Sequence, residues 1–347
     1  MIFLRKILFP IAILYGWIIQ LRNFLYDKGI LKSYSFDIPI IAVGNLSVGG
    51  TGKTPQIEYL IRLLSKNSKV ATLSRGYKRK SNGFILANEH ATAETLGDEP
   101  FQIHQKFSDV QVAVDADRKN GIEQLLSQNT KPEVILLDDA FQHRRVKAGF
   151  YILLTAYGDL FTDDWMLPTG NLRESRSGAA RADMIIVTKC PNNLSELAQK
   201  EIRSKMERYL LRRNESNAAV FFAAVAYDES VYSVDGIKKV SEIKNTPKLL
   251  LAGIAKPKPF FAYLQHENDI VLTYADHHHF SESDIDVIRK RAGNKHVITT
   301  EKDFVRLKEH LPSSQLFYLP IKTTLIAAGD QLDQIILNYV GTSTRNR

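Results

Sequence analysis

The chain has 347 residues, enough for about two domains with cores of their own. Its 44% hydrophobic and 24% charged residues are ordinary for a folded protein and exclude a chain that is disordered throughout. The net charge of +8 indicates attraction to a polyanion, which can be nucleic acid, an anionic membrane or a phosphorylated substrate. The single cysteine, Cys190, has no partner for a disulfide or a cysteine zinc site and fits a reducing, cytosolic environment.

Residues 7–21 form an uncharged run, ILFPIAILYGWIIQL, with lysine and arginine on both sides. As a helix the run spans roughly 22 Å at about 1.5 Å per residue, short of a hydrocarbon core of about 30 Å. A signal peptide would need a small-residue cleavage site, and none follows. The apolar spacing continues to Leu25 instead, and Trp17 suits a headgroup boundary. We predict a helix that embeds in one membrane face; packing on the protein's own core is the alternative.

Residues 40–43, IIAV, are typical of a buried parallel strand and lead into the glycine-rich sequence GNLSVGGTGKTP at residues 44–55. A helical apolar pattern follows, which completes the strand, loop and helix of a Walker A motif. Backbone N–H groups of such a loop cradle phosphate. Lys53 is predicted to reach the β- and γ-phosphates, and Thr54 to bind Mg²⁺. The predicted nucleotide contacts in the loop are Ser47, Val48, Gly49, Gly50, Thr51, Gly52, Lys53 and Thr54.

The segment VILLDD at residues 134–139 places two carboxylates directly after a buried strand. In open α/β sheets, ligands bind at the carboxyl ends of the strands, and a carboxylate there can hold Mg²⁺ directly or through water. Asp138 and Asp139 are therefore predicted to bind the metal together with Thr54. A strand that ends in a solvated pair of aspartates is the alternative for this segment alone.

Further apolar runs alternate with helical segments, which predicts a doubly wound parallel sheet of the P-loop NTPase type. The second half alternates again and predicts a smaller α/β domain that closes over the site. The expected division is a membrane-associated helix at residues 1–35, an ATP-binding domain at 36–213 and the smaller domain at 214–347.

Two incomplete guanine-binding motifs bear on whether the nucleotide is ATP or GTP. GTPases often read guanine with an N/T-K-x-D sequence. Thr188 and Lys189 supply the first two positions, but the aspartate is missing. Thr300–Asp303, with the sequence TEKD, carries one extra residue. We therefore predict ATP rather than GTP.

Taken together, the ordered motifs resemble the tetraacyldisaccharide 4′-kinase family, the lipid A 4′-kinases of Gram-negative bacteria. The matching segments are VGNLSVGGTGKTP at 43–55, SRGY at 74–77, GDEP at 97–100, DDAFQHR at 138–144, LPTGNLRE at 167–174, RADMIIVTK at 181–189, DHH at 276–278 and TEKD at 300–303. Ser47, where the generic loop has glycine, also matches this family. Ala140, Thr169 and Asn171 depart from its commoner residues.

The resemblance implies transfer of the γ-phosphoryl group of ATP to the 4′-hydroxyl of an acylated glucosamine disaccharide 1-phosphate, at the cytoplasmic face of the bacterial inner membrane. It implies Asp98 as the base and His277 as its partner, although a loop acid and a solvated histidine loop are the readings from sequence alone. His278 and His279 remain open as the partner. Lys53 and Asp139 complete the expected catalytic set. Further expected residues are Arg118 and Gln142 at the nucleotide, and His143, Arg173 and Glu174 at the substrate.

Two other functions compete with a lipid kinase. A P-loop ATPase acting as a switch or in cofactor delivery would need no small-molecule acceptor. A nucleic-acid-binding NTPase would rest on the positive charge alone, and the apolar N-terminal helix argues against it. We expect a glycolipid substrate, an anionic membrane surface, no nucleic acid and no obligate protein partner.

Overall fold

The computed structural model describes residues 5, 7–210, 219–276 and 278–345. Its chain forms two compact units. The P-loop unit comprises Met1–Val225 and Thr323–Arg347, and the small unit comprises Ala226–Lys322.

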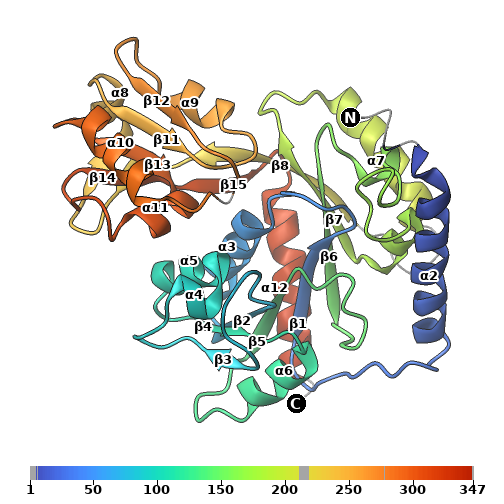
Figure 1. Ribbon diagram of the computed structural model, residues 1–347. Helices are drawn as coiled ribbons and strands as arrows, with labels where there is room; N and C mark the ends of the chain where they lie inside the picture. Colours follow the sequence, from blue (N-terminus) through green and yellow to red (C-terminus); the bar gives the residue numbers. More distant parts are fainter. Residues whose placement is uncertain (1–4, 6, 211–218, 277, 346–347) are drawn as a thin grey trace. The chain divides into compact units, whose positions relative to one another are not determined.

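The P-loop unit is built on a nine-stranded sheet with the order β15-β8-β7-β6-β1-β5-β2-β4-β3. Strand β1 (Ile40–Asn45) lies in its middle, parallel to β5 (Val134–Asp138) on one side and β6 (Phe150–Ala156) on the other (Figure 1). Val43 pairs with Asp138 in this register. The predicted phosphate loop and the predicted metal-binding carboxylates therefore leave the sheet at the same edge, from adjacent strands.

The other strands of this sheet extend it on both sides. Those in parallel pairs are β2 (Val70–Ser74), β4 (Gln111–Val114), β7 (Met184–Cys190) and β8 (Ala219–Tyr227). The edges are β3 (Ile85–Leu86), which is antiparallel to β4, and β15 (Ile321–Leu325).

Helices cover both faces of the sheet. Successive buried side chains of β1 therefore point alternately into two different cores. Ile41 and Val43 share a core with α3 (Lys53–Leu64) and α12 (Gly329–Arg345). Ala42 points to the opposite core. The helices that pack on this second face are α6 (Arg118–Leu126) and α7 (Glu196–Leu210). The predicted doubly wound α/β fold is confirmed.

The small unit has a six-stranded sheet with the order β10-β9-β14-β13-β11-β12, parallel from β14 to β12. Its strands are β9 (Ser230–Tyr232), β10 (Ile237–Lys239), β11 (Leu249–Ala252), β12 (Ile270–Thr273), β13 (Val297–Thr300) and β14 (Leu316–Leu319). Its helices are α8 (Val240–Lys244), α9 (Lys258–Leu264), α10 (Glu282–Ala292) and α11 (Glu301–Leu307). Two cores lie on its two faces, so the predicted second, smaller α/β domain is also confirmed.

The C-terminal helix α12 departs from the expected division, which placed residues 214–347 in the smaller domain. Leu332 and Ile336 are fully buried in the same core as α3. The Tyr339 hydroxyl lies 3.1 Å from the Ile40 nitrogen and 3.2 Å from its carbonyl oxygen. These contacts join residues 323–347 to the P-loop unit. The expected boundary at residues 213 and 214 lies outside the described residues.

The N-terminal apolar run lies within helix α2 (Phe9–Asp27), and Pro10 occupies its first turn, where proline is tolerated. Among its described residues only Ala12 and Gly16 are buried. In the described part of the chain, none of the helices has both the length and the apolarity needed to cross a bilayer.

Candidate active site

The glycine-rich loop connects β1 to the first turn of α3, which begins at Lys53. Gly52 caps the helix in a left-handed conformation (φ 81°), and Gly49 also has a positive φ of 110°. Glycine takes these values without the steric cost that a Cβ brings. Val48, Gly49 and Gly50 are exposed, whereas Thr51 is buried. The predicted Walker A loop is therefore a turn open to solvent that ends on a helix N-terminus, the geometry that binds phosphate.

Asn45 anchors this loop, although no feature of the sequence marked it beyond its place at the end of a strand. Its side chain is fully buried and donates to the Thr51 hydroxyl at 2.9 Å. Its Oδ1 accepts a hydrogen bond from Arg173, and its backbone oxygen accepts from Arg173 at 3.2 Å and from Gln142 at 2.9 Å. Asn45 thus joins the phosphate loop to two residues predicted at the nucleotide and substrate.

Asp139 brings two of the predicted cations together. Arg173 binds its carboxylate with both terminal nitrogens, at 2.8 and 3.1 Å, and the Lys53 Nζ lies 3.6 Å away. Burial alone would raise the pKa of Asp139, but the Arg173 hydrogen bonds and the Lys53 charge lower it to about 2. Asp139 is therefore a permanent anion that holds Lys53 and Arg173 beside the phosphate loop.

Asp138 differs from its neighbour in its partners. Its Oδ1 is buried and has no hydrogen-bond partner among the described residues. Burial raises the pKa of this carboxyl, Glu99 raises it further, and Lys53 opposes the shift. A buried carboxylate oxygen without a donor is costly unless a cation or a proton occupies it. Asp138 thus has the property expected of a Mg²⁺ ligand, and Thr54 lies in the first turn of α3, after the loop that leaves the adjacent strand β1.

Arg118, expected at the nucleotide, is buried, with 3% of its surface exposed. Its guanidinium donates to the backbone oxygens of Asp115 at 3.0 Å and Asp138 at 3.2 Å. These contacts hold the carboxyl ends of β4 and β5 together. They favour a supporting position beneath Asp138, and a direct contact of Arg118 with the nucleotide stays a prediction.

Glu174 is 1% exposed, and its carboxylate is occupied by protein groups. Arg181 donates to both oxygens at 2.5 and 2.8 Å, and Asn23 of α2 donates at 2.7 Å. The Gln142 amide lies 3.4 Å from the same carboxylate. Both carboxylate oxygens of Glu174 are buried and bound by protein donors. These partners favour a structural role for Glu174 over the predicted contact with substrate.

His143 lines a cavity of about 830 Å³ between the C-terminal end of α2 and residues 141–151. Its Nε2 is buried and has no partner among the described residues. Burial lowers the pKa of this imidazole, and the Arg118 charge lowers it further, to about 4. His143 is therefore neutral at physiological pH. It stays a candidate for substrate contact.

Asp98 begins α5 (Asp98–Lys106), directly after Gly97. Gly97 has a φ of 91°, and a Cβ there would lie 3.0 Å from the Tyr77 oxygen. The motifs 74–77 and 97–100 therefore pack against each other, which no local pattern indicated. Asp98 is half-buried, and its neighbour Glu99 is close enough to raise the pKa of Asp138. This places Asp98 on the segment that borders the acidic strand end.

The histidine predicted to assist Asp98, His277, lies outside the described residues. Of the two adjacent histidines, His278 hydrogen-bonds Asp284 at 3.0 Å and His279 is exposed. Asp276, which precedes the three, lies 3.2 Å from Lys302. Among the described residues, the small unit thus ties the DHH motif to the TEKD motif by an ion pair.

Helix α2 contacts the same loops that carry the predicted site residues. The Tyr15 hydroxyl donates to the Arg173 backbone oxygen at 3.0 Å, and Arg22 donates to the Gln142 oxygen at 3.1 Å. Arg144 pairs with Asp27 at 2.6 Å. The opposite face is apolar and exposed, with side chains repeating at helical spacing. Its members include Leu14 at 60%, Trp17 at 70%, Ile18 at 58% and Leu21 at 60%.

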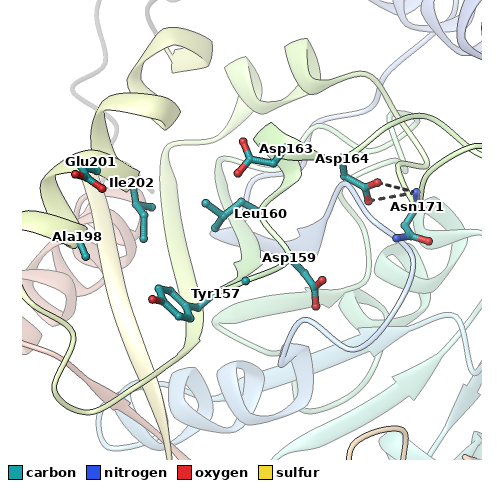
Figure 2. A pocket seen from close by; sticks show the side chains of 10 residues that line it. Tyr157, Asp159, Leu160, Asp163, Asp164, Asn171, Ala198, Glu201 and Ile202 are labelled. Carbon is teal, nitrogen blue, oxygen red and sulfur yellow. Dashed lines mark hydrogen bonds between the residues drawn. The ribbon is translucent and has the colours of Figure 1, made fainter. Parts of the chain in front are cut away.

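A second hollow, of about 470 Å³, lies between residues 157–164 and α7 (Figure 2). Its lining is acidic and includes none of the predicted site residues. Asp164 and Asn171 both line this hollow, and both oxygens of Asp164 accept from the Asn171 nitrogen at 3.2 Å. The Asn171 oxygen in turn accepts from the Val48 nitrogen at 2.7 Å. This region supports the phosphate loop from outside.

A glycine-rich loop between a central parallel strand and a helix, beside a strand that ends in carboxylates, defines a P-loop nucleotide-binding protein. The family model described as Tetraacyldisaccharide-1-P 4′-kinase matches residues 4–341. The chain belongs to this family, which confirms the predicted resemblance and does not favour the switch ATPase.

The relatives agree over nearly the full chain. Tetraacyldisaccharide 4′-kinase of Flavobacterium psychrophilum is 65% identical over 344 residues, which cover 99% of both chains. The enzyme of Bacteroides thetaiotaomicron is 43% identical and covers 99% of this chain and 95% of its own. Among solved structures, LpxK from Aquifex aeolicus in complex with ATP has a TM-score of 0.77 and 29% identity, covering 97% of this chain and 99% of its own.

Proposed function

We infer that this protein transfers the γ-phosphoryl group of ATP to the 4′-hydroxyl of a tetraacylated glucosamine disaccharide 1-phosphate. The observation that carries the inference is the arrangement of Lys53 and Arg173 on Asp139 beside an open phosphate loop, in a member of the 4′-kinase family. The acceptor follows from the family's description, and ATP from its solved relative. Phosphoryl transfer depends mainly on positioning and charge stabilisation, which this arrangement supplies.

The residues present fit a magnesium ion. Asp138 offers a buried oxygen without a partner among the described residues, and Thr54 offers a hydroxyl at the start of α3. Mg²⁺ held there would neutralise charge on the β- and γ-phosphates. Asp139 is the weaker ligand of the predicted pair, because Arg173 occupies both of its oxygens.

Lys53 and Arg173 supply positive charge where negative charge develops on the transferred group. Asp139 keeps both in place, and its low pKa keeps it charged throughout the physiological range. Arg173 also binds Asn45, so the position of its guanidinium is fixed from two sides. A bidentate arginine that is held in this way loses little conformational freedom on meeting phosphate.

Asp98 is our proposed general base, which accepts the proton of the 4′-hydroxyl as that oxygen attacks. His277 is the proposed group that orients or polarises Asp98. Both assignments rest on the match of the GDEP and DHH motifs to the family. The position of Asp98 on the segment bordering the acidic strand end supports the first of them.

The exposed apolar face of α2 supports a peripheral or monotopic location at the cytoplasmic face of the inner membrane. Large apolar side chains gathered on one helix face are typical of interfacial binding, and the positive net charge suits anionic lipid. The opposite face of the helix contacts the Gln142 and Arg173 loops. Acyl chains held along α2 would therefore bring the sugar to the phosphate site. This placement requires neither nucleic acid nor a protein partner.

The test is incubation of the folded protein with γ-labelled ATP, Mg²⁺ and the tetraacylated disaccharide 1-phosphate in mixed micelles. We expect labelled lipid, and labelling about 10²–10³-fold slower with Lys53→Ala. ATP hydrolysis without labelled lipid would exclude the kinase. Disaccharide that already carries a 4′-phosphate is the matched control acceptor and should remain unlabelled.

A further inference from the structure

The carboxyl end of β7 contacts the phosphate loop through two side chains. Thr188 and Lys189 stand at the carboxyl end of this strand, which is separated from β1 only by β6. They are the two residues that resemble the start of a guanine-reading motif but lack its aspartate. The structure gives them partners in the phosphate loop.

Thr188 is buried, and its hydroxyl donates to the Thr51 backbone oxygen at 2.7 Å. The same hydroxyl lies 3.2 Å from the Thr155 oxygen. Lys189 is exposed, and its Nζ donates to the Gly50 backbone oxygen. Two consecutive side chains therefore bind two consecutive carbonyl groups of the loop.

The backbone of Lys189 is unusual in a way that makes this contact possible. Its φ is 57°, in the left-handed region that residues with a Cβ seldom adopt. The pairing of β7 with β8 shifts register between Val187 and Cys190 at the same point. Such a bulge redirects a side chain out of the regular alternation. Here it lets Thr188 and Lys189, neighbours in a strand, face the same loop.

The bound carbonyls fix the direction of the loop's peptide groups. In a trans peptide the C=O bond and the N–H bond of the following residue lie in one plane and point in opposite directions. Holding the Gly50 and Thr51 oxygens toward β7 therefore sets the planes that carry the Thr51 and Gly52 N–H groups. Asn45 holds the Thr51 side chain from the other strand end. The loop is thus held from β1 and from β7.

We propose that Thr188 and Lys189 are positioning residues that hold the phosphate loop in its binding conformation and so set its affinity for the polyphosphate of the nucleotide. The proposal rests on the nucleotide-binding part of the proposed function. Lys189 acts through the Gly50 carbonyl and not on the base. Because Lys189 is exposed, this contact adds little to overall stability, so its effect falls on binding.

Calorimetric titration with Mg–ATP and with Mg–tripolyphosphate, which has no base, tests the proposal. For Lys189→Met we expect Kd for both ligands to rise by the same factor, about fivefold, the middle of the range for one hydrogen bond. Thr188→Val removes a buried donor and should raise both by about tenfold, while Thr188→Ser keeps the hydroxyl and should restore binding. Lys200→Met, at an exposed lysine of α7, is the matched control.

Unchanged affinity in Lys189→Met would overturn the proposal. A loss for ATP without a loss for tripolyphosphate would also overturn it, because Lys189 would then act on the base or the ribose. The melting temperature of Lys189→Met should stay within about 1 °C of the parent, which keeps the test valid if Thr188→Val fails to fold. These affinities do not depend on a lipid acceptor, so failure of lipid labelling and failure of this proposal are separate results.

Discussion

The phosphate edge of the sheet and the outer face of α2 belong to one unit but are stabilised in opposite ways. At the phosphate edge, buried polar groups bind one another, as Asn45 does with Thr51 and Arg173. On the outer face of α2, Trp17 leaves 70% of its surface exposed. The first region is completed by its own contacts. The second is an exposed apolar surface, whose contact with water is unfavourable, and this supports the proposed contact with lipid.

The two regions are joined by the inner face of α2. Asn23 binds Glu174, and Tyr15 binds the backbone of Arg173, which itself holds Asp139. Helix α2, our proposed lipid contact, therefore also contacts the loop that carries Arg173. Substitutions in the phosphate edge should affect chemistry, those in the junction should affect stability, and those on the outer face should affect lipid binding.

The largest effects are expected at the phosphate edge. Lys53→Ala removes a charge that stabilises the transition state and should lower kcat about 10²–10³-fold while also weakening ATP binding.

Asp98→Asn removes the proposed base and should lower kcat about 10²–10⁴-fold with ATP affinity nearly unchanged. Steady-state kinetics with the lipid acceptor, together with titration of ATP, separate the two.

Asp109→Asn, at an exposed aspartate just beyond α5, is the matched control for Asp98→Asn and should leave both quantities unchanged. Full turnover in Asp98→Asn would eliminate Asp98 as the base. A parallel loss of ATP affinity in that variant would instead place Asp98 at the nucleotide.

The junction is tested by Glu174→Ala. This change leaves Arg181 without its partner in a site where Glu174 is 1% exposed, and it also removes the acceptor of Asn23. Breaking a buried pair on one side should lower the free energy of unfolding by about 3 kcal/mol. Urea denaturation measures it. Glu207→Ala, at an exposed position of α7, should change it by less than about 0.5 kcal/mol. An equally small change in Glu174→Ala would favour the substrate role predicted from the sequence.

The phosphate edge was also the more predictable region. Its strand, loop and helix follow one another within residues 40–64, so a local pattern identified them. The placement of Asp138 and Asp139 at the sheet edge that carries the loop followed from the general rule on ligand sites in parallel sheets, whereas the adjacency of β1 and β5 was not predicted. What the sequence did not reveal depends on distant contacts. Arg173 lies 128 residues from Asn45, and α12 returns to β1 after the small unit. No local periodicity reports such pairings.

The two faces of α2 show the same limit. The sequence offered membrane contact and packing on the protein's own core as alternatives. The structure packs one face of the helix on the protein and leaves the other exposed. Ala12 and Gly16 recur at a spacing of four residues on the packed face, but small residues within an apolar run do not by themselves predict which face is covered.

A smaller effect is expected on that exposed face. The triple variant Leu14→Ser, Trp17→Ser and Ile18→Ser removes its centre and should weaken binding to anionic vesicles at least about tenfold, since each side chain buries apolar area in the interface. Vesicle co-sedimentation measures it, and ATP affinity should not change. Leu197→Ser, at a leucine of α7 that is 69% exposed, is the control. Equal vesicle binding by the triple variant would remove α2 as the membrane contact.

The smallest effect is a pH dependence at His143, which lies between the two regions. Burial and Arg118 lower the pKa of His143 to about 4, and the other charged groups that act on it are Asp117, Arg22 and Arg145. In the unfolded chain, His143 binds a proton with the ordinary histidine pKa of about 6.5. In the folded chain it binds a proton only at lower pH. The stability linked to the neutral imidazole is therefore complete above that value and is lost as the pH falls toward 4. His143→Gln should flatten the decline in unfolding free energy between about pH 7 and pH 5, whereas His90→Gln, at an exposed site, should leave it unchanged. An identical decline in the His143 variant would mean that its imidazole is protonated as readily in the folded protein as in water, and that the cavity beside α2 is more open than its burial indicates.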